Sequence, residues 1–440
     1  MVDGSVRLFG TDGVRGRANS HVTPELAFDL ARAAGEGSDG PVVIGRDTRR
    51  SGPMLSSALH AGFNTVGVDS VDLGIIPVGA VSRLARDTGA RYGVMVSASH
   101  NPGEDNGIKF FGPDGAKLSD EREEAIEARF RKGRPWPRPS GAAVGFQSVM
   151  SDAVDRYVER ISDGFPYNLR GMSFALDCAN GAALLAAPRL FERVGAEVEV
   201  FAADPDGMNI NLGCGATHPD YLAERAGGRI GFAFDGDADR LIAIDEDGVP
   251  ANGDVLMAIF ARHLKEAGKL KNDLVVTTVM SNLGFRKAME VLGVKVVETD
   301  VGDRYVIEEM RRTRAVLGGE QSGHILLSDR STGDGLRSAL QLAAVLAGTG
   351  RELRDLRTIM REYPQVLENV PVADVGRLVD AAPVWAAVAE AQRRLANHGR
   401  VLVRASGTEP VVRVMVEATT AAIAKDVVGR LVEVVTDELG

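Results

Sequence analysis

Two short stretches of the chain carry residue types that could do chemistry together. Ser99 stands at the end of the apolar run 94–96, and the acidic triplet Asp235, Asp237 and Asp239 follows another apolar run. A serine hydroxyl is a weak nucleophile on its own. Three carboxylates at a spacing of two can converge on one hard cation such as Mg²⁺. A metal beside a serine nucleophile is typical of phosphoryl transfer, in which positioning and charge neutralisation lower the barrier.

The acidic triplet has two alternative interpretations, a calcium loop and an exposed acidic turn. Its spacing matches positions one, three and five of an EF-hand, and Glu246 matches position twelve. Arg240, however, stands where that loop needs glycine, and the flanking residues 231–234 and 241–244 read as strands rather than helices. We therefore reject the EF-hand. The apolar strand that leads straight into the triplet argues against a surface turn.

Two further residues are candidates for proton transfer. Lys109 follows the serine loop, and His324 lies in a glycine-punctuated loop after another apolar run. The alternatives are a solvated lysine and a structural histidine. His100 could also act as the base for Ser99, but adjacent residues at a strand end usually diverge, so we expect a structural or orienting role for it.

A loop near the end of the chain carries groups that suit a phosphate. Arg404 offers a guanidinium fork, while Ser406, Gly407 and Thr408 offer hydroxyls and backbone N–H groups. Arg413, on the strand-like run that follows, either binds the same anion or points to solvent. We therefore expect a phosphate site in this last part of the chain.

The elements that must position these residues read as repeated αβ units. Ligand sites in open α/β sheets lie at the carboxyl ends of strands, and each candidate loop follows an apolar run. Strand-like runs alternate with helical patterns, as in the run 42–49, which ends in polar residues and is followed by a probable helix over 53–66; this is typical of mainly parallel sheets. We predict an α/β protein of three related αβ domains with mixed, mainly parallel sheets, plus a small C-terminal α+β domain. The expected boundaries are 1–150 with the serine loop, 151–253 with the metal loop, 254–367 with the His324 loop, and 368–440 with the phosphate loop.

Composition excludes several classes of function. The 440 residues carry a formal net charge of −10, which argues against general nucleic-acid binding. Cys178 and Cys214 lie in separate segments and indicate neither a disulfide framework nor a metal site. No run approaches the roughly 18 apolar residues of a membrane span, and we find no signal peptide, so we expect a cytoplasmic protein without membrane partners.

Five motifs together resemble the α-D-phosphohexomutase superfamily, and within it the bacterial-type phosphoglucosamine mutases. The resemblance covers essentially the whole chain, and the five motifs in this order and spacing are very specific. The motif at 320–324, with glutamine at position 321, is similar to the same motif in the glucosamine branch of the superfamily. The motifs lie at residues 9–16, 97–102, 235–240, 319–324 and 404–410.

The resemblance implies an isomerase, an intramolecular phosphotransferase that interconverts glucosamine 6-phosphate and glucosamine 1-phosphate. It implies phosphoserine at Ser99, one Mg²⁺ per active site held by that residue and the three aspartates, and glucosamine 1,6-bisphosphate as intermediate or activator. Four domains would surround a central cleft. Such an enzyme would stand at the entry to UDP-N-acetylglucosamine biosynthesis, which supplies peptidoglycan precursors.

The resemblance also implies roles for further residues. Lys109 and His324 would exchange protons, and the loop that begins at Arg404 would hold the phosphate that does not react. Small sugar phosphates are the expected partners, with a homodimer as an open possibility. The remaining residues implied are Arg15 and Arg240 as catalytic groups, and Glu320, Ser322 and Arg304 as substrate-binding groups.

Three other functions are alternatives to this interpretation. A phosphoglucomutase or phosphomannomutase of the same superfamily would keep the mechanism and change the sugar. A non-catalytic sugar-phosphate-binding relative would not need Ser99 together with three aspartates. A metal phosphatase would release inorganic phosphate instead of retaining it.

Overall fold

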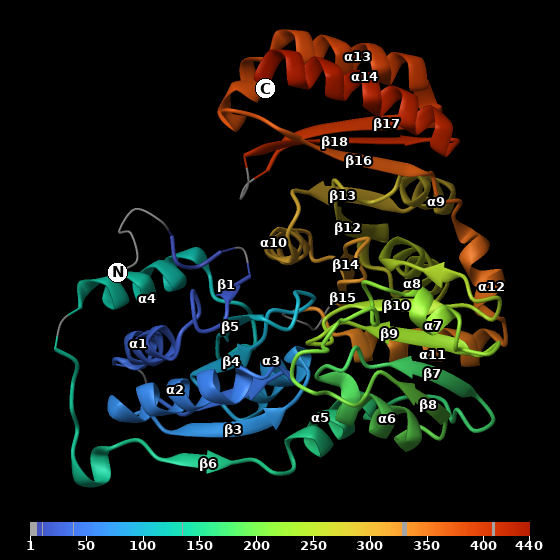
Figure 1. The fold of residues 1–440 in the computed structure, drawn as a ribbon. Coiled ribbons are helices and arrows are strands. Elements are labelled where there is room, and N and C mark those ends of the chain that lie inside the picture. The colour runs from blue at the N-terminus through green and yellow to red at the C-terminus, as the bar shows by residue number, and fades with distance from the viewer. Residues whose placement is uncertain (1–6, 11, 38, 134, 328–331, 407–409) are drawn as a thin grey trace. The chain divides into compact units, whose positions relative to one another are not determined.

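The protein forms two compact units in a computed structural model that describes residues 7–10, 12–37, 39–133, 135–327, 332–406 and 410–440. The first unit comprises Met1–Val279 and Lys295–Thr358. The second comprises Met280–Val294 and Ile359–Gly440. Figure 1 shows the elements of each unit along the chain.

The first sheet of the first unit has six strands in the order β1-β5-β4-β2-β3-β6. Local sequence explains the start of the first helix: Thr23 Oγ1 accepts a hydrogen bond from Leu26 N at 3.2 Å, and Pro24 occupies the first helical position. The elements are β1 Val14–Arg17, α1 Pro24–Gly35, β2 Val42–Arg46, α2 Gly52–Thr65, β3 Ser70–Ile75, α3 Val78–Asp87, β4 Tyr92–Val96, β5 Asp105–Phe111, α4 Asp120–Lys132 and β6 Gln147–Val149.

Two further sheets complete the first unit, in the orders β11-β10-β9-β7-β8 and β13-β12-β14-β15. Elements of the second sheet and its helices are α5 Ala153–Ser162, β7 Ser173–Asp177, α6 Ala183–Arg193, β8 Glu197–Phe201, α7 Asp220–Ala223, β9 Ile230–Phe234, β10 Leu241–Ile244 and β11 Pro250–Ala251. Those of the third are α8 Gly253–Glu266, β12 Leu274–Thr278, β13 Lys295–Thr299, α10 Asp303–Thr313, β14 Leu317–Gly319, β15 Ile325–Leu327, α11 Gly335–Thr349 and α12 Leu353–Leu356.

All three sheets combine parallel strands with an antiparallel hairpin. Strands β2, β7 and β12 each pair in parallel with both neighbours. The hairpins β4–β5, β9–β10 and β14–β15 are antiparallel. The predicted fold class, with mixed and mainly parallel sheets, is therefore confirmed.

One predicted strand was misplaced by two residues. The apolar run 315–317 predicts a strand, but β14 starts only at Leu317. Arg314 adopts a left-handed backbone at the end of α10, and the N–H of Ala315 bonds to the Met310 carbonyl. The first residues of the run therefore belong to the helix cap.

The second unit is built on the antiparallel sheet β16-β18-β17, which α13 and α14 cover (Figure 1). Val412, Val414 and Val416 of β18 alternate inward and pack against Val427 and Leu431 of α14, as the period of two requires. The predicted small α+β domain is present. Its elements are α9 Leu283–Leu292, β16 Gln365–Pro371, α13 Ala382–Leu395, β17 Gly399–Ala405, β18 Val411–Ala418 and α14 Ala421–Leu439.

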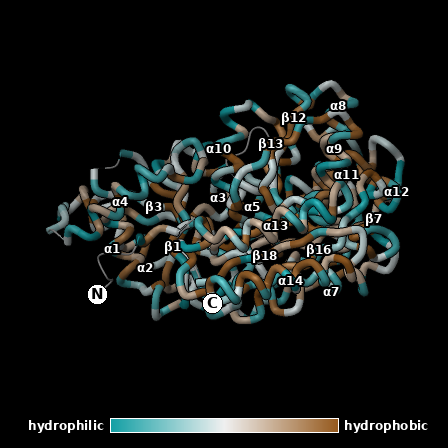
Figure 2. The backbone as a smooth tube through the Cα atoms, turned by 90° about the horizontal axis from the view of Figure 1, so that it is seen from above, coloured by the Kyte–Doolittle hydropathy of each residue, from teal (hydrophilic) through white to brown (hydrophobic). Residues whose placement is uncertain are grey.

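Short 3₁₀ segments and the hydropathy of the chain complete the description. Figure 2 shows hydrophobic strands and helix faces alternating with hydrophilic connections along the tube. Among the described residues we find no helix with the length and apolar character needed to span a bilayer. The 3₁₀ segments are Gly141–Ala143, Lys271–Asp273, Arg357–Ile359, Val375–Asp380 and Ala396–His398.

Candidate active site

The three predicted site loops of the first unit are the hairpin connections of its three sheets. The Ser99 loop joins β4 to β5, the acidic triplet joins β9 to β10, and the His324 loop joins β14 to β15. Arg240 and His324 form an antiparallel bridge, and Ser99 bonds to Asp235. Residues more than 200 positions apart in the sequence therefore meet at one site.

Ser99 is held in an uncommon conformation with its hydroxyl on the acidic triplet. Its backbone φ is 52°, in the left-handed region, and it is buried. The Oγ donates to Asp235 Oδ2 at 2.6 Å. His100 Nδ1 lies 3.4 Å from that Oγ, but burial and then the charges of Arg240 and Arg15 lower the pKa of His100 to about 4. Such a ring is a weak proton acceptor, which favours the orienting role.

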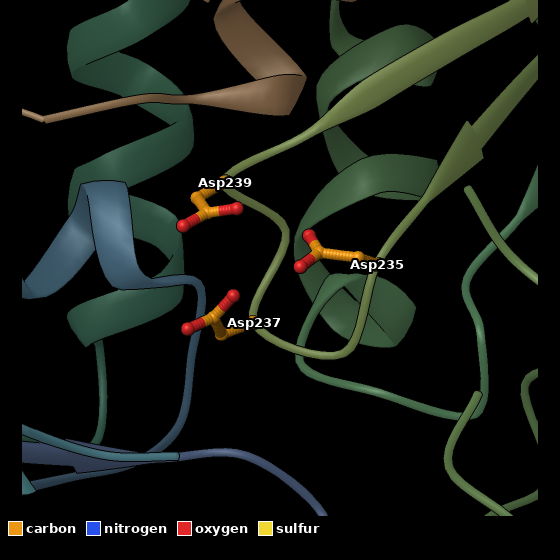
Figure 3. A group of neighbouring side chains, drawn as sticks. All are labelled: Asp235, Asp237 and Asp239. Atoms are coloured by element: carbon orange, nitrogen blue, oxygen red, sulfur yellow. The ribbon is translucent and has the colours of Figure 1, made fainter. Parts of the chain in front are cut away.

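The triplet is a buried cluster of converging carboxylates (Figure 3). One oxygen from each of Asp235, Asp237 and Asp239 lies within 4.8 Å of the others. Burial, and then repulsion from Asp239 and Asp237, raise the pKa of Asp235 well above its usual range. Asp237 Oδ1 and Asp239 Oδ1 are buried without a hydrogen-bond partner among the described residues. Oxygens in this state fit a hard cation, so the triplet could bind a metal.

Lys109 is a buried ammonium group beside the triplet and not a solvated side chain. Its Nζ lies 2.7 Å from Asp237 Oδ2 and 3.0 Å from Asp12 Oδ2. Burial lowers the pKa of Lys109, but Asp12 and Asp237 outweigh burial and raise it above its usual value. Lys109 therefore carries a positive charge at the site.

His324 stands between two carboxylates. Its Nδ1 is 3.5 Å from Asp239 Oδ2, and its Nε2 is 3.5 Å from Asp303 Oδ2. Burial lowers its pKa, but Asp239, Asp303 and Glu320 outweigh burial and raise the pKa to about 9. The Gly333 N–H points at Nε2 at 3.1 Å, which stabilises the neutral ring instead. The surroundings thus support both protonation states of His324.

Arg15 and Arg240 also lie beside the triplet. Arg240 Nε is 3.7 Å from Asp239 Oδ1, and Arg15 pairs with Asp12. Burial lowers the pKa of Arg15, but Asp12, Asp237 and Asp239 outweigh burial and raise it. Both arginines therefore add positive charge where an anion would meet the carboxylates.

The guanidinium of Arg304 bonds to acidic residues of α4. Glu320 and Ser322 both lie in the His324 loop, and Ser322 Oγ donates to the Glu320 carboxylate at 3.4 Å. Glu320 also accepts a hydrogen bond from Gly302 N at 3.1 Å. Arg304 Nη2 instead donates to Glu123 Oε2 at 2.8 Å, and the guanidinium also contacts Asp120. In this state Arg304 ties α10 to α4.

The predicted phosphate residues lie in the second unit. Arg404 on β17 and Arg413 on β18 are directly opposite one another in the antiparallel register. Ser406 is buried, and its N–H bonds to the Val411 carbonyl. Gly407 and Thr408 lie outside the described residues.

The prediction missed several charged residues of the site. Lys117 contacts both Asp12 and Asp303, so it joins the loop before β1 to the start of α10. The sequence prediction also missed Asp47 and Arg49, which follow β2 directly. In the structure β2 pairs in parallel with β4, so its end lies beside the Ser99 loop. The sequence offered only polar residues after an apolar run, the same pattern as at Ser99.

The four domain models of the phosphoglucomutase/phosphomannomutase family match the chain in order. Alpha/beta/alpha domains I, II and III match residues 6–135, 155–248 and 252–363. The C-terminal domain matches residues 367–434. Together these matches cover most of the sequence.

Individual proteins agree with the domain models. The phosphoglucosamine mutase of Desulforudis audaxviator is 49% identical over 98% of each chain. That of Streptomyces coelicolor is 48% identical over 99% of this chain and 100% of its own. A family protein from Burkholderia thailandensis has a TM-score of 0.82 at 25% identity, covering 98% and 97% of the two chains. N-acetylphosphoglucosamine mutase of Aspergillus fumigatus, in complex with GlcNAc-6P and magnesium, has a TM-score of 0.71 at 20% identity, covering 99% and 97%.

Proposed function

The chain belongs to the phosphoglucomutase/phosphomannomutase family, among the phosphoglucosamine mutases, and from this we propose that it interconverts glucosamine 6-phosphate and glucosamine 1-phosphate. One observation carries the proposal within this chain. The hydroxyl of Ser99 lies 2.6 Å from a buried carboxylate of a triplet in which two oxygens have no hydrogen-bond partner among the described residues. The proposed nucleophile therefore lies directly beside the proposed cation site.

The proposed reaction has two half-reactions that use the same residues. Phosphoserine 99 transfers its phosphoryl group to the free hydroxyl of the sugar phosphate: the Oγ–P bond breaks, an O–P bond to the sugar forms, and the hydroxyl proton passes to a base. Glucosamine 1,6-bisphosphate results and returns its other phosphoryl group to Ser99. Lys109 supplies positive charge and a proton beside the nucleophile, and His324 exchanges a proton with the sugar hydroxyl.

We propose that Asp235, Asp237 and Asp239 hold one Mg²⁺, with a phosphoserine oxygen as a further ligand. Carboxylate oxygens are the ligands that this ion prefers. When bound, Mg²⁺ would neutralise charge on the phosphoryl group. Glu320 and Ser322 would contact the sugar hydroxyls.

The second unit would hold the phosphate that does not react. Arg404 and Arg413 face one another on antiparallel strands, so their two guanidinium groups can act on one anion. A guanidinium binds phosphate through two parallel N–H···O bonds. We propose that Arg404, Arg413 and Ser406 form this site together with Gly407 and Thr408.

Phosphorus NMR of the purified protein tests the function directly. The protein with Mg²⁺ and a trace of hexose bisphosphate is given glucosamine, glucose or mannose phosphates in turn. We expect the glucosamine phosphates to interconvert fastest and Ser99→Ala to abolish turnover with unchanged circular dichroism. Faster turnover of glucose or mannose phosphates would change the sugar and keep the mechanism. Release of inorganic phosphate would instead favour a phosphatase.

The proposal extends to the organisation and location of the protein. We propose domain boundaries after residues 150, 253 and 367, a cytoplasmic location and a homodimer. Light scattering on the purified protein measures the oligomeric state. A monomer of 46.7 kDa would contradict the dimer and leave the reaction unaffected.

A further inference from the structure

We propose that Asp47, Arg49 and Ser97 form a positioning network that sets the Ser99 hydroxyl for phosphoryl transfer. Arg49 is fully buried, and it is not among the residues to which a catalytic role was assigned above. The inference rests on the proposed function, in which Ser99 carries the phosphoryl group.

Arg49 uses all five of its N–H donors. Its Nε donates to Asp47 Oδ2 at 2.9 Å. The four remaining donors bond to backbone carbonyls of the nucleophile loop: Ser99 at 2.9 Å, Asn101 at 2.8 Å, Asp105 at 3.0 Å and Pro102. The loop is therefore wrapped around a single guanidinium.

The same network also fixes the other side of the Ser99 peptide. Ser97 Oγ accepts the Ser99 N–H at 2.9 Å and donates to Asp47 Oδ2 at 2.7 Å. Asp47 in turn binds Arg49, which holds the Ser99 carbonyl. Both backbone polar groups of Ser99 are thus tied to one closed ring of hydrogen bonds.

This ring explains how Ser99 keeps an unfavourable backbone. A non-glycine residue at φ 52° is strained and persists only where its surroundings over-determine it. Asn211 Nδ2 adds a second donor to the Ser99 carbonyl at 2.9 Å. The backbone conformation sets the direction of the Cα–Cβ bond, so the network aims the Ser99 side chain at Asp235, to which its Oγ donates.

The charge balance between Asp47 and Arg49 favours a positioning role for Arg49 over a direct catalytic role. Asp47 neutralises Arg49 within the network, and both side chains have no exposed surface. Arg49 contacts the backbone of Ser99 and not its hydroxyl. It therefore acts through the loop, and lysine cannot replace it, since an ammonium has only three donors.

The test compares three variants of the full-length protein. Ser97→Ala removes one member of the ring at small cost in volume, and Arg49→Lys keeps the charge but loses donors. Arg83→Lys is the matched control, because Arg83 is also nearly buried and pairs with Asp87 on its own helix. For each variant we measure kcat, KM, thermal unfolding and the rate at which Ser99 takes up a phosphoryl group from glucose 1,6-bisphosphate.

We expect kcat and the uptake rate to fall about tenfold in Ser97→Ala and about 100-fold in Arg49→Lys, since a displaced reacting group costs this much. KM stays within about twofold, because the sugar and phosphate sites are unchanged. Arg83→Lys retains both rates. A merely structural network would lower the unfolding temperature and leave the rates of the folded protein alone.

Rates within about twofold of wild type in Ser97→Ala and Arg49→Lys would overturn the inference. If Arg49→Lys does not fold, Ser97→Ala decides alone. A wild-type protein that takes up the phosphoryl group but does not interconvert sugar phosphates would refute the proposed function. The uptake rates would then still test the positioning network.

Discussion

Individual residues of the site form a buried cluster of opposite charges. Carboxylates of the triplet and of Asp12 and Asp303 alternate with Lys109, Lys117, Arg15 and Arg240. The triplet nevertheless keeps unfavourable electrostatics: burial, and then repulsion from Asp239 and Asp237, raise the pKa of Asp235. The metal-free protein is therefore less stable than the same chain with a bound cation would be.

Asp235→Asn tests this balance. The amide keeps the acceptor for the Arg240 N–H but removes one negative charge from the cluster. We expect Mg²⁺ affinity to fall at least about tenfold, because ligand charge governs binding of hard cations. The metal-free variant should unfold about 1 °C above wild type, the shift that about 1 kcal/mol produces in a chain of 440 residues.

Titration calorimetry with Mg²⁺ and thermal unfolding with excess chelator measure these two effects. Asp245→Asn serves as a control, since Asp245 lies at the far end of β10 and outside the triplet. Equal Mg²⁺ affinity in wild type and Asp235→Asn would remove the triplet as the metal site.

Sequence reasoning at this scale identified residue types but not their long-range partners. Ser99, Lys109 and His324 stood out because polar residues followed apolar strands. The pairing of Lys109 with Asp12, or of Arg304 with Glu123, depends on where loops about 100 or more residues apart come to rest. Arg49 was overlooked because two polar residues after a strand are indistinguishable from a surface turn until packing buries them.

Hairpins and helices are the elements that bring the site residues together. The triplet hairpin packs against the serine loop so closely that a Cβ at Gly236 would lie 2.4 Å from the Ser99 carbonyl oxygen. The strands and most helices were predictable because their hydrophobic periods are local. This backbone contact between two hairpins was not, because it depends on the packing of two sheets.

Gly236→Ala should therefore displace one hairpin from the other. Overpacking of this kind costs about 1–3 kcal/mol, and we expect activity to fall at least about tenfold with it. Gly429→Ala is the contrasting change, since a Cβ there in α14 meets nothing within 4 Å. It should stabilise the protein by about 0.5–1 kcal/mol through the unfolded state and the helix. Urea unfolding and turnover are measured for both variants. Equal changes in stability and activity in the two would contradict the close contact at Gly236.

His60 of α2 predicts a pH dependence of stability. It is buried, its Nδ1 lies 2.8 Å from Ser70 Oγ, and burial lowers the pKa of His60 below 6.5. The unfolded chain then binds the proton more readily than the folded protein. The contribution of His60 is complete above about pH 6.5 and is lost as pH falls through the folded pKa.

The measurement is the unfolding temperature between pH 7.5 and 5 for wild type and His60→Gln. Glutamine does not titrate, so the difference between the two curves isolates the histidine. We expect wild type to lose more stability than the variant as pH falls. Parallel curves would show that His60 does not contribute.

At the scale of the whole molecule, a buried ion pair holds the second unit together. Arg400 Nε donates to Glu417 Oε2 at 2.7 Å, and its Nη2 reaches the Ser281 carbonyl at 2.6 Å. Glu417 also accepts from Leu283 N at 2.8 Å and Asn282 Nδ2 at 3.3 Å. The predicted domain at 254–367 includes residues 280–294, which the structure places in the second unit.

Glu417→Ala should destabilise the second unit selectively. It leaves the Arg400 charge buried without its carboxylate, which costs about 3–5 kcal/mol. We expect faster hydrogen exchange in 280–294 and 359–440, with Mg²⁺ binding at the triplet retained. Glu368→Ala on the exposed part of β16 is the control. Uniformly faster exchange across both units would contradict two separable units.

The second unit is made of two separate segments of the chain, which limits how the protein can be divided into fragments. The chain passes between the two units three times, at residues 279–280, 294–295 and 358–359. A fragment that begins at residue 368 would match the C-terminal family model and yet lack α9, leaving Glu417 without the partners at 282 and 283. The four sequence domains follow one another along the chain, but each compact unit is assembled from two separate segments. Exchange of C-terminal domains between relatives therefore requires exchanging two segments of the gene, not one.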